Sequence, residues 1–291
     1  MTIFNLGSIN VDHVYRVPHI PAPGETLASL DYSQGLGGKG ANLSVAVAKA
    51  GAAVVHIGAV GAGAERVMAE LEGHGVALGH VARREGPTGH AIINVDAAGE
   101  NAIVLLPGAN MSLTEAEVTA ALAGAGAGDI FVTQNETNLQ AEAARAAKEA
   151  GLKVCYCAAP FDAAAVEAML PHADLLILNA VEAGQLQEAT GKAPGGLGVA
   201  DVVVTRGAEG VTWHGAGAGP GGARNFAAIK VSAVDTTGAG DTFAGYLLAG
   251  LEEGMEMPEA ISLALRAAAL KVTRAGAAAG IPHRAEVDAT L

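Results

Sequence analysis

The chain has few aromatic residues and only two cysteines. Aromatic residues make up 3% of its 291 residues, and Cys155 and Cys157 lie within the single stretch KVCYCAAP. Two cysteines on one strand make a poor disulfide, and the sequence has no second pair to complete a zinc site, which favours buried free thiols. The apolar residues, 51% of the chain, are mainly Ala, Val, Leu and Ile. They suit helices packed closely on a buried sheet.

The sequence also lacks a basic cluster and a long apolar run. Lys and Arg number 17 against 30 acidic residues, which gives a net charge of −13. Nucleic acid is therefore not an expected partner. No apolar run reaches the ~18 residues of a membrane span, and the N-terminus has no basic leader. We therefore expect a cytoplasmic protein that makes no contact with a membrane.

Apolar strands alternate with helical segments along most of the chain, as in DIFVTQNE, LKVCYCAAP and ADLLILNA with the segments between them. This order predicts a mostly parallel sheet with helices on both faces, a three-layer α/β/α fold in one domain over residues 1–291. Two separated segments, at about 11–33 and 88–107, instead alternate apolar and polar residues and contain no helical pattern. We expect these two segments to form a small lid of β-strands or a dimer surface.

The stretch VDTTGAGDTF, from Val234 to Phe243, carries the strongest functional signal. Its small residues allow the backbone to approach a phosphate, and the first N–H groups of the following helix attract an anion. Asp241 is placed there to take the proton of a hydroxyl group that attacks a phosphoryl group. A glycine turn with an Asp cap explains Gly238 to Asp241 alone more simply, but the wider stretch is much more specific.

A second glycine-rich stretch, GLGGKGAN, runs from Gly35 to Asn42. It fits the G-x-G-x-x-G pattern of dinucleotide-binding proteins, yet it follows an exposed, Pro-rich segment and the next strand does not end in an acid. It is not a Walker A loop either, because Ser33 and Gly40 stand at two of the required positions. An oxidoreductase therefore rests on a misplaced pattern, and a polyhydroxy ligand held by backbone, a lysine and an amide fits better.

Together these stretches resemble the ribokinase (PfkB-type) family of carbohydrate kinases along nearly the whole chain. The matching segments, in the family's order and spacing, are GSINVD, PAPGET, GGKGAN, PGAN, LNAVE, VVTRGAEGV, AVDTTGAGDTFAG and VTRAGA. The resemblance implies a ribokinase-like fold with a strand lid. It also implies ATP-dependent phosphorylation of the primary hydroxyl of a pentose, with D-ribose converted to D-ribose 5-phosphate. A sister kinase acting on deoxyribose, a nucleoside or a fructose derivative stays open.

The resemblance also implies roles for individual residues on the sugar side. Asp241 would be the catalytic base, and the N–H groups of Gly238, Ala239 and Gly240 would form the anion hole. The residues that would bind the sugar are Asn10, Asp12, Gly38, Lys39, Asn42 and Glu136, together with Asp241. Taken alone, Asn10 could merely close a turn and Asp12 could be a solvated acid on an exposed strand.

On the nucleotide side the resemblance implies ATP as co-substrate, with Mg²⁺ and a monovalent cation. The residues that would contact the nucleotide are Asn179, Thr205, Gly207 and Gly240. Asn179 and Glu182 would organise Mg²⁺ through water, although a helix cap with a first-turn acid explains the same pair. Asp235 and Thr237, with backbone carbonyls near Arg274 to Ala277, would surround the monovalent cation, expected to be K⁺.

Two features of the nucleotide half depart from the family pattern. The segment from Gly191 to Asp201 is shorter than the helix usual there, and Leu265 stands where a polar residue is often found. The identity of the phosphate donor therefore stays open. A sugar-binding protein that has lost catalysis also stays open as an alternative function. The alternating apolar residues of the lid segments favour a homodimer joined through the lid strands.

Overall fold

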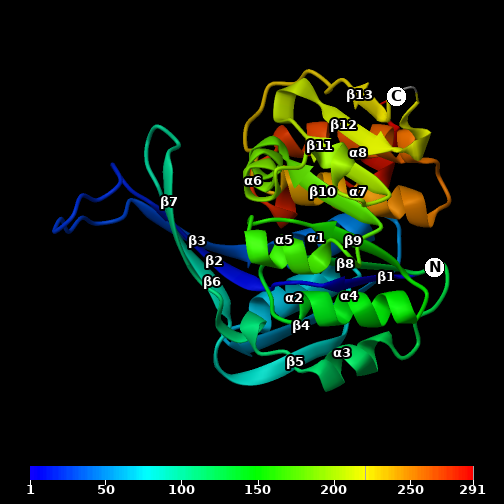
Figure 1. Cartoon of the computed structure of the whole chain (residues 1–291). Coiled ribbons are helices and arrows are strands. Elements are labelled where there is room, and N and C mark those ends of the chain that lie inside the picture. The colour runs from blue at the N-terminus through cyan, green and yellow to red at the C-terminus, as the bar shows by residue number, and fades with distance from the viewer. Residues whose placement is uncertain (220, 291) are drawn as a thin grey trace.

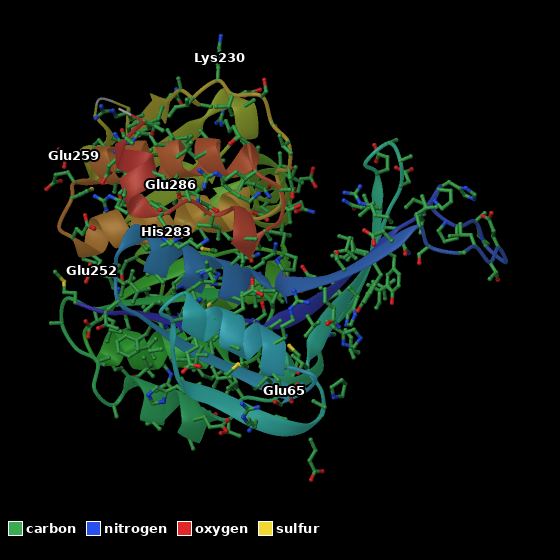
Figure 2. All side chains as sticks on the ribbon, turned by 180° about the vertical axis from the view of Figure 1, so that it is seen from behind. Glu65, Lys230, Glu252, Glu259, His283 and Glu286 are labelled. Carbon is green, nitrogen blue, oxygen red and sulfur yellow. The ribbon has the colours of Figure 1, made fainter. Side chains whose placement is uncertain are left out.

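Two β-sheets organise the part of the chain that the computed structural model describes, residues 1–219 and 221–290. The larger sheet has nine strands in the order β13-β12-β11-β10-β9-β8-β1-β4-β5, and the smaller has four in the order β3-β2-β6-β7. Figure 1 shows the larger sheet embedded among helices and the smaller one projecting from its side. Figure 2 shows the same projection from behind.

The larger sheet is mostly parallel, as predicted. Every neighbouring pair from β5 to β11 in the sheet order is parallel, and β12 is antiparallel to both of its neighbours, β11 and β13. Its strands are β1 (Ile3–Leu6), β4 (Val54–Ala62), β5 (Ala77–Pro87), β8 (Ile130–Gln134), β9 (Lys153–Cys157), β10 (Leu175–Asn179), β11 (Asp201–Thr205), β12 (Val211–Gly215) and β13 (Ala223–Phe226).

Helices cover both faces of this sheet and close a separate hydrophobic core on each. One core contains side chains of α1 (Lys39–Ala50), α2 (Glu65–Gly73), α7 (Ala239–Glu252), α8 (Met257–Val272) and α9 (Arg284–Asp288). The other contains side chains of α3 (Glu115–Leu122), α4 (Gln140–Glu149), α5 (Ala163–Met169) and α6 (Ala180–Thr190). The three-layer prediction is therefore confirmed.

Alternation along β9 illustrates how one strand serves both cores. Cys155 and Cys157 point into the first core, whereas Val154 and Tyr156 point into the second. A strand sends successive side chains to opposite faces, so a strand buried on both faces must be apolar throughout. Both cysteines are buried free thiols, as the sequence predicted.

The smaller sheet is built mostly from the two alternating segments, but β3 extends beyond residue 33 into the glycine-rich stretch that begins at Gly35. Its strands are β2 (Asn10–Arg16), β3 (Asp31–Gly37), β6 (Gly89–Val95) and β7 (Asn101–Leu106). β2 is antiparallel to β3 and parallel to β6, so one strand joins two segments that are far apart in sequence. Asn10 lies opposite both Gly37 and Gly89 in this register. The chain therefore passes from the larger sheet to the smaller one at Asn10, the first residue of β2.

Two strands of the larger sheet were not predicted. β5 is an edge strand whose side chains are mostly exposed or half-buried, and its sequence, ALGHVARREGP, has no apolar alternation to reveal it. β13 is a four-residue strand at the other edge, inside a glycine-rich stretch. Within the described residues, no helix is long and apolar enough to cross a membrane.

Candidate active site

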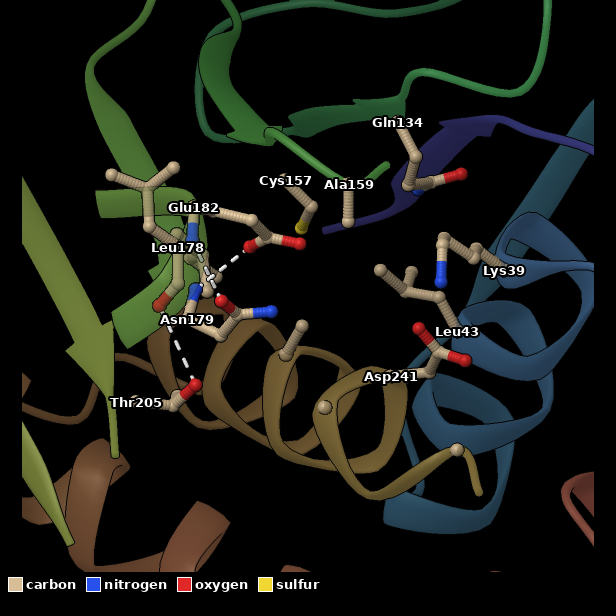
Figure 3. A pocket seen from close by; sticks show the side chains of 14 residues that line it. Lys39, Leu43, Gln134, Cys157, Ala159, Leu178, Asn179, Glu182, Thr205 and Asp241 are labelled. Carbon is tan, nitrogen blue, oxygen red and sulfur yellow. Dashed lines mark hydrogen bonds between the residues drawn. The ribbon is translucent and has the colours of Figure 1, made fainter. Parts of the chain in front are cut away.

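A cavity of about 220 Å³ opens where the carboxyl ends of β8, β9 and β10 meet the N-termini of α1 and α7. Ligands of open α/β sheets bind at this edge because strand ends and helix N-termini converge there. In Figure 3 the ammonium group of Lys39 and the carboxylate of Asp241 face each other across one end, and Asn179 and Glu182 form the opposite wall.

Glycines bring the start of α1 against the loop that follows β1. Gly38, the N-cap, has φ 92°, and a Cβ on Gly40 would lie 2.4 Å from the Cα of Gly7. Only residues without a side chain allow this approach. The close contact places Lys39 at the cavity and lets its backbone N–H donate to Glu136 at 3.0 Å.

The Lys39 ammonium lies among three carboxylates. Burial by itself lowers the pKa of Lys39, but the neighbouring negative charges outweigh burial and raise it above its usual range. These charges belong to Asp241, Glu136 and Glu182. A lysine held cationic in this way can attract a phosphate or stabilise charge that develops during its transfer.

Asp241 lies in the first turn of α7, three residues after the glycine N-cap Gly238, which has φ 75°. Asn42 Nδ2 donates a hydrogen bond of 3.0 Å to Asp241 Oδ2. The two helices can approach so closely because Gly245 has no side chain: a Cβ there would lie 2.5 Å from the Cβ of Ala46. Burial raises the pKa of Asp241, while Lys39 and the Asn42 hydrogen bond act in the opposite direction.

The sequence-predicted sugar residues from the small sheet gather beside this cavity. Asn10 is 4% exposed, and its Oδ1 accepts a hydrogen bond of 2.8 Å from Nδ2 of Asn110. The Asp12 side chain packs on Gly37, where a Cβ would lie only 2.0 Å from Asp12 Oδ1. Burial raises the pKa of Asp12 to about 6, and repulsion from Glu136 adds to the shift.

Three residues that support the site were not singled out from the sequence. Asn110 accepts from the backbone N–H of Ile9 and donates to Asn10, Ser8 donates to the Glu136 carboxylate, and Gln134 lines the cavity. Asn110 belongs to the PGAN stretch and Ser8 to the GSINVD stretch, and these two stretches were the available signals. Within the described residues, Gln134 Oε1 and Asn42 Oδ1 are buried without a hydrogen-bond partner. Unpaired buried acceptors at a cavity favour a ligand that supplies hydroxyl donors.

Asn179 and Glu182 form a helix cap on α6 and also face the cavity. Asn179 Oδ1 accepts from the Glu182 N–H at 2.8 Å, and Glu182 Oε2 accepts from the Asn179 N–H at 2.7 Å. Burial raises the pKa of Glu182. Within the described residues there is no cluster of three or more His, Cys, Asp or Glu side chains that could hold a metal ion. The pair therefore fits a metal ion only if water or phosphate supplies most of the ligands.

A second, mostly apolar cavity of about 390 Å³ adjoins the first. Both cavities are lined by Thr205 and Gly240, so the anion-binding start of α7 lies at their junction. Gly207 and Leu265 line only the second cavity. Its other walls come from α8 and from the segment between β13 and α7, where Lys230 extends outward in Figure 2. The flat ring system of a nucleotide fits between such walls, with the phosphates of the nucleotide directed toward Gly240.

The residues expected to surround a monovalent cation are brought together, but they do not fit one. Asp235 accepts hydrogen bonds from the backbone N–H groups of Thr237, at 2.9 Å, and Gly276, at 2.8 Å. The Lys271 ammonium donates to the carbonyl oxygens of Asp235 and Arg274, which the prediction reserved for the ion. A second positive charge against the same carbonyls would be repelled, so these carbonyls do not suit a monovalent cation as well as Lys271.

A paired lysine and carboxylate beside a helix N-terminus, between a polar and an apolar cavity, define a site for group transfer from a nucleotide. The model of the pfkB family of carbohydrate kinases matches residues 2–284, and the chain belongs to this family. The ribokinase of Haemophilus influenzae is 37% identical over 300 residues, which cover 98% of this chain and 96% of the relative.

Solved structures agree with this assignment. Ribokinase from Cryptococcus neoformans in complex with ADP superposes with a TM-score of 0.87 at 31% identity, over 100% of this chain and 99% of that one. Arabidopsis thaliana ribokinase complexed with ribose and ATP gives a TM-score of 0.85 at 29% identity, over 99% and 97% of the two chains. The predicted family, fold and enzyme class are thereby confirmed.

Proposed function

We propose that this carbohydrate kinase transfers the γ-phosphoryl group of ATP to the primary hydroxyl of D-ribose and forms D-ribose 5-phosphate. The observation that carries the proposal is the position of Asp241. Its carboxylate lies in the first turn of α7, beside Lys39 and Asn42, and lines the first cavity next to Gly240, which lines both cavities. The similarity to the Haemophilus influenzae ribokinase and to the Arabidopsis thaliana ribokinase complexed with ribose and ATP supports ribose as the acceptor and ATP as the donor.

The sugar would occupy the polar side of the cleft. Asn10 and Asp12 approach it from β2, whereas Gly38, Lys39 and Asn42 approach it from the start of α1. The Glu136 carboxylate, held by hydrogen bonds from Ser8 and the Lys39 N–H, would accept a further hydrogen bond from a ring hydroxyl of the sugar. Because several of these groups already have protein partners, the sugar meets a wall whose donors and acceptors are oriented before it binds.

Asp241 is the proposed base. It takes the proton of the primary hydroxyl as that oxygen bonds to the γ-phosphorus and the bond from phosphorus to the β–γ bridging oxygen breaks, which releases ADP. A carboxylate with a raised pKa holds a proton more strongly and is a better base for this task. The N–H groups of Gly238 and Gly240, with the Lys39 ammonium, would stabilise the negative charge on the transferring group. The third expected donor, the Ala239 N–H, donates to the Thr236 carbonyl at 3.2 Å and would have to leave it.

ATP would place its base in the apolar cavity and its phosphates near Thr205, Gly207 and Gly240. No residue of the short segment 191–201 lines this cavity, whose walls come mainly from the end of β11, the 228–233 segment, α7 and α8. Asn179 and Glu182 would hold Mg²⁺ through water. When bound, Mg²⁺ neutralises charge on the triphosphate.

We propose that the chain is one domain. Its four-stranded sheet would serve both as a lid over the sugar and as the surface that joins two copies of the chain. Four consecutive apolar residues of β7, Ile103 to Leu106, are each more than 40% exposed. A second copy of this chain would cover them, and sedimentation equilibrium tests for that dimer. A cytoplasmic location stays a prediction.

The decisive experiment is a phosphorylation screen with ATP and Mg²⁺ over ribose, deoxyribose, fructose and nucleosides. We expect ribose to have the highest kcat/KM. Preference for another furanose would move the assignment to a sister kinase without changing the mechanism. Failure to phosphorylate any of these sugars, with sugar binding intact, would refute the proposed activity.

A further inference from the structure

Lys271, near the end of α8, has a side chain that is fully buried, at 0% exposure. Lysine is almost never fully buried without partners, because an ammonium group loses its hydration inside a protein. The catalytic steps proposed above do not use this residue. Its burial therefore requires a separate explanation.

The partners of Lys271 are oxygen atoms of the backbone. Its Nζ donates to the carbonyl of Asp235 at 3.0 Å and to that of Arg274 at 3.4 Å. Burial lowers the pKa of Lys271, and the Asp235 carboxylate acts in the opposite direction. The Arg274 guanidinium is paired elsewhere, at 2.8 Å with Glu286 of α9, which is labelled in Figure 2. Carbonyl oxygens around one positive charge are also how proteins hold a dehydrated monovalent cation.

A glycine provides the room for this side chain. A Cβ on Gly280 would lie 3.1 Å from Cδ and 3.2 Å from Cε of Lys271, closer than most Cβ contacts. Without a Cβ at position 280, the aliphatic part of Lys271 reaches the carbonyl groups unhindered. The lysine and the glycine therefore act as a fitted pair.

The ammonium is connected to the anion hole through Asp235. Asp235 binds the N–H of Thr237 with one carboxylate oxygen and the N–H of Gly276 with the other. These two hydrogen bonds join the loop before α7 to the turn after α8. The loop and the turn also pack closely, since a Cβ on Gly238 would lie 3.4 Å from the Cα of Ala277. The position of the N–H groups at 238–240 therefore depends on the charge that holds Asp235 and the turn together.

We propose that the Lys271 ammonium is a covalently tethered replacement for an activating monovalent cation, and that this kinase works without added K⁺. Lys271 is then a positioning residue that holds the anion-hole loop. The inference rests on the proposed function of that loop. In this proposal the Lys271 ammonium group takes the place of a diffusible ion, and it cannot dissociate from the protein.

The first test is cation dependence of ribose phosphorylation at constant ionic strength, with tetramethylammonium as the background cation. Wild-type turnover should be the same with K⁺, Na⁺ or tetramethylammonium. Lys271→Ala should lose turnover by up to about 100-fold in tetramethylammonium, because the loop shifts, and recover it with K⁺ or NH₄⁺, which fit the vacated space. Lys271→Met, which fills that space without a charge, is the matched control and should not recover.

Thermal unfolding supplies a readout that does not require activity. K⁺ should raise the Tm of Lys271→Ala by at least about 2 °C and leave the wild type and Lys271→Met unchanged. Stimulation of the wild type by K⁺ overturns the inference even if the alanine variant does not fold. Lys271→Ala that is fully active in tetramethylammonium, or inactive with neither rescue nor a Tm shift, also overturns it. A wild type inactive in every salt contradicts the proposed function, while the Tm measurement still tests Lys271.

Discussion

The two walls of the cleft are built in different ways. On the sugar side, polar side chains are held by other protein groups: Asn110 binds Asn10, Asn42 binds Asp241, and the Lys39 N–H binds Glu136. On the nucleotide side, the cavity is lined mainly by apolar residues of α8 and of the 228–233 segment, with glycine backbone at its rim.

This difference follows from the cost of burying polar groups. A buried donor or acceptor that loses its partner costs about 1–3 kcal/mol, so most groups of a polar wall are paired with other protein groups before the ligand binds. Apolar contact is non-directional and roughly proportional to area, so an apolar wall tolerates small changes of shape. Changes on the sugar side should therefore cost more than comparable changes on the nucleotide side.

The largest effect is expected at the point where the two walls meet. Asp241→Asn should lower kcat by about 10²–10⁴-fold, because the hydroxyl loses its proton acceptor. The affinity for ribose, measured by calorimetry, should change little, since an amide can still contact the sugar and Asn42. Glu253→Gln, just beyond the other end of α7, is the control and should keep wild-type turnover. An Asp241→Asn enzyme with normal kcat would show that the base is misassigned.

The rigidity of the sugar wall is tested on β3. Gly37→Ala should raise the KM for ribose roughly 10- to 100-fold, because the new methyl group displaces the Asp12 carboxylate, a charged hydrogen-bonding group. Gly35→Ala on the same strand is the matched control, since a Cβ there meets no described atom within 4 Å. Steady-state kinetics at saturating ATP measure both variants, and equal KM values would argue against a preformed wall.

The charge on the sugar wall is tested by pH. Asp12 has a pKa of about 6, so it is mostly ionised at pH 7 and mostly protonated at pH 5. If the ionised form binds the sugar, the KM for ribose should rise about tenfold between pH 7 and pH 5. Asp12→Asn should give a high KM that no longer varies over this range. A wild-type KM that stays flat would show that the charge of Asp12 does not contribute to binding.

The smallest effect is expected on the nucleotide wall. Leu265→Ala should raise the KM for ATP about fivefold, equivalent to about 1 kcal/mol, because a half-buried side chain loses part of its apolar contact. The KM for ribose should not change. Leu265→Met keeps the volume and serves as the control. An effect as large as that of Gly37→Ala would remove the contrast between the walls.

The sequence predicted much of the architecture because the strongest patterns are local. Apolar strands such as ADLLILNA and helices with regular spacing can be recognised from one segment alone, and the two alternating segments predicted the small sheet. β5 escaped because an exposed edge strand has no apolar pattern. Asn179 and Glu182 form the predicted cap while facing the cavity, and local sequence could not separate the two roles.

The site was predicted in part, through residues that lie within recognisable stretches. Gly238 to Asp241 and the glycine-rich start of α1 could be found in this way. Asn110 and Ser8 could not be singled out, because each acts on a residue about 100 or more positions away. Lys271 was not singled out for a related reason: it resembles an ordinary helical lysine in the sequence, and only folding brings it to Asp235, 36 residues away.

The sequence by itself determined where strands, helices and phosphate-binding turns form, since these depend on side-chain periodicity and on glycine at particular positions. Tertiary structure alone decided which groups far apart in the sequence interact electrostatically or form a hydrogen bond. Such contacts depend on through-space distance and on exclusion of water, and neither property is encoded in any one segment. In this protein, folding brings the ammonium group of a helical lysine, Lys271, against the backbone carbonyls of Asp235 and Arg274.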